Sequence, residues 1–181
     1  MENRNILKKT NKYIATLLII VLAASTRLIP HPPNFAPIAG ISLFSGAKLN
    51  KKQAFLIPLS VMFISDIFLG FHSTMPYIYL SFVLIVFIGM FVKKRLNFHN
   101  LVLASLTSSV LFYFITNFGV WASTALYPKT LSGLLQSYIL AIPFFNNTIA
   151  SDLLYTGSLF YGYQLIEYLV KRFAFIKNSV K

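Results

Sequence analysis

Three ionisable side chains, Arg27, Asp66 and Asp152, interrupt apolar stretches of this 181-residue chain. An ionised side chain near the centre of a membrane helix costs about 2.5–3.5 kcal/mol, so such groups usually pair or face a polar cavity. At a rise of about 1.5 Å per residue, Arg27 and Asp66 lie about 20 Å above the inner ends of their predicted helices. Asp152 lies about 10 Å below the outer end of its own helix. All three share the outer half of a bilayer core, which predicts that Arg27 pairs with Asp66 or Asp152.

Other polar and aromatic residues are expected near this charged level. Residues 98–121 carry a polar side chain at every fourth position, which places these side chains on one helix face. They are Ser105, Ser109, Tyr113 and Asn117. The candidate solute-binding residues are Arg27, Asn34, Asp66, His72, Asn117, Trp121, Asn147 and Asp152. Two interpretations are open: an outward-opening cavity for a polar solute, or a structural ion-pair cluster whose second Asp is protonated or hydrogen-bonded.

The basic residues indicate how the chain crosses the membrane. All of the 16 Lys and Arg except Arg27 and Lys129 fall in four clusters. The clusters are Arg4/Lys8/Lys9/Lys12, Lys48/Lys51/Lys52, Lys93/Lys94/Arg95 and Lys171/Arg172/Lys177/Lys181. Because basic residues stay on the cytoplasmic side, the pattern predicts an all-α bundle of six transmembrane helices with both termini in the cytoplasm.

The expected spans are residues 13–30, 36–48, 54–71, 77–92, 98–121 and 145–168. Span 36–48 is rich in small residues and covers only about 18–20 Å, so it must lie among other helices. Span 77–92 is uniformly apolar and is expected to face lipid. The proline-rich segment 31–37 cannot be regular helix. The segment 131–142 is too short to span the membrane. We expect it to form a re-entrant or interfacial helix that Pro143 ends.

The domain organisation follows from these spans. We expect a cytoplasmic basic tail over residues 1–12, one six-helix transmembrane domain over residues 13–170 and a second basic tail over residues 171–181. Ala23-Ala24-Ser25 could imitate a signal-peptide cleavage site, although Arg27 is an unusual residue so near the start of a mature chain.

Composition favours a multi-pass protein of the bacterial inner membrane. Hydrophobic residues make up 56% of the chain and charged residues 11%, whereas soluble domains average about 25% charged. The net charge of +12 comes from residues that flank apolar stretches, so we expect the lipid bilayer, and not nucleic acid, to be the partner. The chain contains no Cys, which excludes disulfides and thiolate metal ligands.

Enzyme signatures are missing from the sequence. There is no G-x-S-x-G motif for a serine nucleophile and no Walker A loop for ATP hydrolysis. His31, His72 and His99 are scattered, without the i, i+4 spacing of a helical metal site. We therefore expect no catalytic activity, no metal and no cofactor.

Three stretches together resemble a known family. They are Arg27-Leu-Ile-Pro-His-Pro-Pro-Asn-Phe-Ala-Pro-Ile-Ala39, Pro58-Leu-Ser-Val-Met-Phe-Ile-Ser-Asp-Ile-Phe-Leu-Gly-Phe-His72, and Ser108 to Asp152 with Thr116-Asn-Phe-Gly-Val-Trp121 and Ala141-Ile-Pro-Phe-Phe-Asn146. The combination resembles small bacterial membrane proteins known only as candidate transport proteins. These are similar in size and span count to the substrate-binding S components of energy-coupling-factor vitamin transporters.

The resemblance implies uptake of a small polar, vitamin-like solute from outside, with a separate energy-coupling ATPase module as partner. S components usually carry Ala-x-x-x-Ala in the first span, for contact with that module. Here Ala15 is followed four positions later by Ile19. The alternatives are a structural or assembly protein with a buried Arg–Asp packing cluster and no solute, and a membrane enzyme of unknown chemistry.

Overall fold

The computed structural model describes residues 23 and 25–179 of the chain, and in this part it is helical throughout, without strands. Its elements are α2 (Ile38–Lys48), α3 (Lys51–Leu69), α4 (Met75–Val92), the short 3₁₀ helix η1 (Lys93–Arg95), α5 (Phe98–Ser123), α6 (Leu131–Ile139) and α7 (Ile142–Ser179). The all-helical class predicted from the sequence is confirmed for these residues. The span predicted over residues 13–30 falls mostly outside the described residues.

Among the described residues, three stretches are long and apolar enough to cross a membrane: Lys51–Leu69, Met75–Arg95 and Phe98–Ser123. Large apolar side chains are exposed along them, including Phe68 at 71% and Phe91 at 81%. Soluble monomers rarely expose large contiguous apolar surfaces, whereas lipid covers such side chains favourably. The helices therefore agree with the membrane class that the composition predicts.

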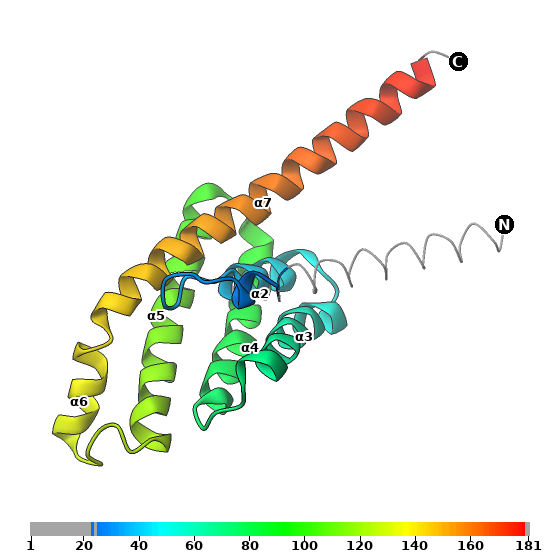
Figure 1. The fold of residues 1–181 in the computed structure, drawn as a ribbon. Coiled ribbons are helices and arrows are strands. Elements are labelled where there is room, and N and C mark those ends of the chain that lie inside the picture. Colours follow the sequence, from blue (N-terminus) through cyan, green and yellow to red (C-terminus); the bar gives the residue numbers. More distant parts are fainter. Residues whose placement is uncertain (1–22, 24, 180–181) are drawn as a thin grey trace.

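Polar side chains fix where several helices begin. The side chain of Asn50 accepts the Gln53 backbone N–H at 3.0 Å at the start of α3. Asn97 does the same for Asn100 at 2.8 Å at the start of α5. Such N-caps satisfy backbone N–H groups that have no partner within the helix. The short connections between α3, α4 and α5 make these helices run alternately up and down (Figure 1).

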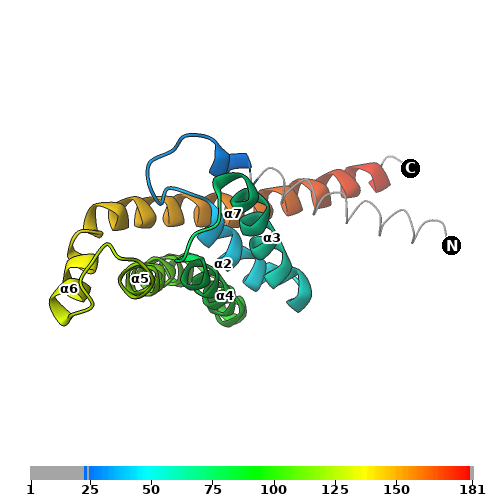
Figure 2. The same ribbon diagram turned by 60° about the horizontal axis from the view of Figure 1, so that its bottom comes forward.

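Helix α2 is the centre of the packing and contacts α3, α4 and α7 (Figure 2). Nine of its 11 residues are buried, as expected for a short apolar helix among others. Its backbone meets that of α4 at two glycines: a Cβ on Gly46 would clash with the Val86 carbonyl, and one on Gly89 with the Leu43 carbonyl. The expectation that 77–92 simply faces lipid is therefore wrong for one face of α4, which small residues let pack against α2.

A proline inside α3 supplies a link between α2 and α3. Pro58 has no backbone N–H, so the carbonyl of Ala54 lacks its usual intrahelical donor. The Ser45 hydroxyl on α2 donates to this carbonyl at 2.8 Å. The proline thereby creates an acceptor that a neighbouring helix satisfies.

The segments before α2 and around α7 position the site. Residues 29–37 are irregular, as their prolines predict. Helix α6 ends at Ile139, and Pro143 lies in the first turn of α7, where a missing N–H costs little. The prediction that Pro143 ends the preceding helix is therefore wrong. Helix α7 also exceeds the predicted 145–168, and its C-terminal part extends away from the other helices (Figure 1).

Candidate functional site

The first component of the site is a buried network around Asp66. Arg27 Nη1 lies 2.8 Å from Asp66 Oδ1, and the Tyr79 hydroxyl donates to Asp66 Oδ2 at 2.9 Å. Arg27 Nη1 also donates to the Ser65 hydroxyl and, at 3.4 Å, to the Met62 carbonyl. The carboxylate is 3% exposed, so its charge depends on these partners for stabilisation. The predicted pairing of Arg27 with one of two Asp residues is confirmed, with Asp66 as the partner.

The second component is Asp152 on α7. Its Oδ2 accepts a hydrogen bond from the Ser109 hydroxyl of α5 at 2.7 Å, and the residue is 2% exposed. Ser109 belongs to the polar face predicted for residues 98–121. Among the described residues, Arg27–Asp66 is the one ion pair, so in this part of the chain Asp152 has a hydrogen bond but no cation.

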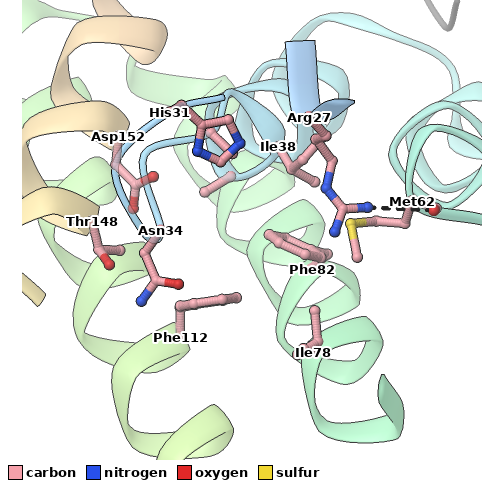
Figure 3. Close-up of a pocket in the computed structure, with 12 residues that line it drawn as sticks. Arg27, His31, Asn34, Ile38, Met62, Ile78, Phe82, Phe112, Thr148 and Asp152 are labelled. Atoms are coloured by element: carbon pink, nitrogen blue, oxygen red, sulfur yellow. Dashed lines mark hydrogen bonds between the residues drawn. The ribbon is translucent and has the colours of Figure 1, made fainter. Parts of the chain in front are cut away.

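A cavity of about 160 Å³ lies between these two components. Its lining combines charged, polar and apolar side chains from the 25–39 segment and four helices. They are Arg27, His31, Asn34, Ala36, Ile38, Ala39, Met62, Ile78, Phe82, Phe112, Thr148 and Asp152. Figure 3 shows Arg27 and Met62 on one side, Asp152 and Thr148 on the other, and Phe82 and Phe112 between them.

Helix α7 holds the proline-rich segment over the cavity. The Asn147 side chain donates to the Pro33 carbonyl at 3.1 Å, and the Ser151 hydroxyl donates to the Asn34 carbonyl at 3.3 Å. Asn34 has a left-handed backbone with φ of 62°, a conformation that Asn tolerates better than most residues. These bonds hold the segment whose His31 and Asn34 line the cavity.

The predicted site residues thus fall into two groups. Arg27, Asn34 and Asp152 line the cavity, Asp66 holds Arg27, and Asn147 holds the segment that carries Asn34. The remaining three bond close to their own position in the chain. His72 bonds to Thr74 at 2.7 Å, Asn117 donates to the Tyr113 carbonyl at 2.8 Å, and Trp121 donates to the Pro128 carbonyl at 3.0 Å. None of these three lies in the cavity wall.

Sequence reasoning missed most of the apolar lining. Ile78 and Phe82 come from α4, which the uniform hydropathy of 77–92 gave no reason to place at a site. Phe112 directly precedes the predicted polar residue Tyr113. An apolar residue in an apolar helix cannot be recognised from the sequence as part of a site. Thr148, in contrast, could have been predicted because it lies one helical turn before Asp152.

The donor set suits polar recognition better than metal binding. The described residues contain no group of three or more His, Cys, Asp or Glu that could hold a metal ion. What the site presents is one cation, one carboxylate, an imidazole, an amide and a hydroxyl beside two phenyl rings. This combination can hydrogen-bond a polar head and pack against a flat apolar body.

The chain matches a known protein family over most of its length. The sequence model of the family described as "Family of unknown function (DUF6580)" matches residues 7–174. This range covers most of the 181 residues, so the chain belongs to that family. Neither the curated proteins nor the solved structures include a match to the chain.

Proposed function

We propose that this member of the DUF6580 family is a multi-pass inner-membrane protein that binds a small polar solute from outside, as the first step of uptake. The observation that carries the proposal is the cavity in which Arg27, Asn34 and Asp152 converge beside two aromatic rings. A few polar groups in a mostly apolar wall are typical of small-molecule sites. Ionisable residues within membrane helices commonly mark solute pathways.

The proposed topology has six spans with both termini in the cytoplasm, α2 as the short span and α6 as an interfacial or re-entrant helix. The basic η1 lies at the opposite end of the bundle from the turn at residues 70–74 and the loop at residues 124–130 (Figure 1). Basic residues favour the cytoplasmic side. Asp66 is one turn before Gly70, whose N–H bonds to its carbonyl at 2.9 Å, so this orientation puts the ion pair in the outer half.

The cavity volume restricts the solute. At about 160 Å³, the cavity is close to an engineered cavity of about 150 Å³ that holds benzene. Drug-sized ligands occupy about 300–1,000 Å³. The solute that fits is therefore smaller than most vitamins, or inserts only a head group. Energy for uptake would come from a separate energy-coupling ATPase module or from an ion gradient.

Native mass spectrometry of the gently purified full-length protein tests solute binding. The wild type should carry a bound small molecule. Ala36→Leu adds bulk to the cavity wall and should abolish the bound mass, whereas Ala122→Leu, equally half-buried but outside the wall, should keep it. If Ala36→Leu keeps the bound mass at the wild-type level, the molecule binds elsewhere and the proposed site is wrong.

A structural role is the second candidate, because Asp66 ties three segments together. Arg27 reaches it from the segment before α2, Asp66 itself lies on α3, and Tyr79 reaches it from α4. Under this alternative, no solute is recovered from the wild type, and cavity variants change stability alone.

A further inference from the structure

The two charged ends of the cavity differ in how far they are already neutralised. Arg27 faces the Asp66 carboxylate at 2.8 Å, so their charges cancel at short range. Asp152 accepts a hydrogen bond from Ser109, but no described cation pairs with it. If both carboxylates are ionised, the described groups leave one negative charge in the cavity wall, located at Asp152. A buried charge without a counter-ion is costly, and a bound cation would relieve that cost.

Several groups near Asp152 can accept hydrogen bonds. The Thr148 hydroxyl donates to the Phe144 carbonyl at 3.0 Å, which leaves its oxygen free to accept. His31 Nδ1 lies 2.9 Å from the Pro32 carbonyl, which can only accept, so Nδ1 carries a proton and Nε2 is the ring's other hydrogen-bonding atom. Asn34 adds an amide oxygen to the wall. Figure 3 shows Asn34, Thr148 and Asp152 together on the side of the cavity away from Arg27.

The apolar part of the wall also suits a cation with a flat body. Phe82 and Phe112 pack with their ring centroids 5.4 Å apart, and both line the cavity. Aromatic faces attract ammonium groups, most strongly where water is excluded. The volume of about 160 Å³ admits a body close to benzene in size.

We infer that the solute is a small organic cation: a protonated amine directed at Asp152, on a flat or apolar body beside Phe82 and Phe112. An ammonium group has three N–H donors and no acceptor, which matches the carboxylate, hydroxyl and amide oxygens of this side. This inference rests on the proposed function, because it names the chemical class of the solute that the same cavity would take.

Three probes of similar shape test the charge: benzylammonium, benzyl alcohol and benzoate, titrated calorimetrically into full-length protein in lipid nanodiscs. Benzyl alcohol can also donate to the Asp152 carboxylate, but only benzylammonium adds an opposite charge, so it should bind at least about 10-fold more tightly than benzyl alcohol. Benzoate should bind most weakly. Asp152→Asn keeps an oxygen for Ser109 and should remove most of the preference for benzylammonium over benzyl alcohol.

The possible results separate the inference from the proposed function. If benzoate binds more tightly than benzylammonium, the cavity takes an anion at Arg27, and the inference is wrong while solute binding stands. Equal affinities for benzylammonium and benzyl alcohol also overturn the inference alone. If no probe binds the wild type and no solute copurifies with it, the proposed function fails as well. The comparison of probes on the wild type needs no variant, so a misfolded Asp152→Asn leaves the test decisive.

Discussion

Arg27 and Asp66 are 39 positions apart in the chain and form an ion pair of 2.8 Å. The Asp66 side chain is 3% exposed and that of Arg27 is 17% exposed. All hydrogen bonds that Arg27 makes to the described residues use Nη1. Arg27 also lines the cavity, so the same residue can fix helix packing and contact a solute.

Breaking this pair should destabilise the protein strongly. Arg27→Met leaves the Asp66 carboxylate buried without its cation, which typically costs about 3–5 kcal/mol. Asp66→Asn in the same chain should restore part of the loss, because the uncompensated charge is then gone. Unfolding in detergent monitors both, and Arg95→Met serves as a control at an exposed cation, expected to change stability by less than about 0.5 kcal/mol. Strictly additive losses in the double variant would show that the two residues do not interact.

Two buried serines on α5 should respond oppositely to the same substitution. Ser109→Ala removes the donor to Asp152 and should cost about 1–3 kcal/mol, because a buried polar group loses its partner. Ser105, one turn earlier, has a buried hydroxyl without a hydrogen-bond partner among the described residues. Ser105→Ala should therefore be neutral or stabilising. The midpoint of thermal unfolding measures both variants, and equal losses would contradict the Ser109–Asp152 bond.

The close approach of α2 and α4 predicts a third effect on stability. Gly89→Ala places a methyl group against the Leu43 carbonyl, where neither backbone can yield easily. We expect a loss of about 1–3 kcal/mol, as for other overpacked contacts. Gly157→Ala on α7 meets nothing within 4 Å and should be neutral or slightly stabilising, since Ala favours helix. A Gly89→Ala protein as stable as the control would mean that the two helices do not touch there.

The sequence predicts how far along its helix a site residue lies, but not which way the helix faces. The depth of a residue in the membrane follows from counting residues along its helix. This counting correctly predicts that Arg27 and Asp66 lie at the same level. The prolines correctly predict that residues 31–37 are irregular, because the missing proline N–H affects only the neighbouring backbone. These are properties of one segment at a time.

Counting residues does not predict how a helix is rotated about its axis or which other helices it packs against. Asn117 lies near the right depth, yet it bonds to the Tyr113 carbonyl of its own helix and is absent from the cavity wall. The partnership of Ser109 with Asp152 depends on how α5 and α7 face each other. Phe82 gave no signal because its neighbours in α4 are equally apolar.

The proposed topology makes a prediction about the side on which exposed residues lie. The chain lacks Cys, so each introduced cysteine is the sole thiol. Lys51→Cys and Arg95→Cys should resist an impermeant thiol reagent applied to intact spheroplasts, whereas Ser73→Cys and Ala125→Cys should react, all four positions being exposed. Permeabilised cells provide the control in which all four react. Labelling of Lys51→Cys from outside would contradict the short span α2 and the six-span count.

The proposed uptake requires that the cavity between Arg27 and Asp152 opens to the outside of the membrane. Thr148 lines this cavity and is 4% exposed, whereas Ser42 on α2 is fully buried elsewhere. The decisive measurement is the labelling rate of Thr148→Cys in intact spheroplasts by a small impermeant thiol reagent, with Ser42→Cys as the buried control. We expect that Thr148→Cys reacts from outside, that Ser42→Cys does not, and that adding Ala36→Leu slows the reaction. Labelling of Thr148→Cys only after permeabilisation, or at the rate of Ser42→Cys, would contradict an outward-opening cavity.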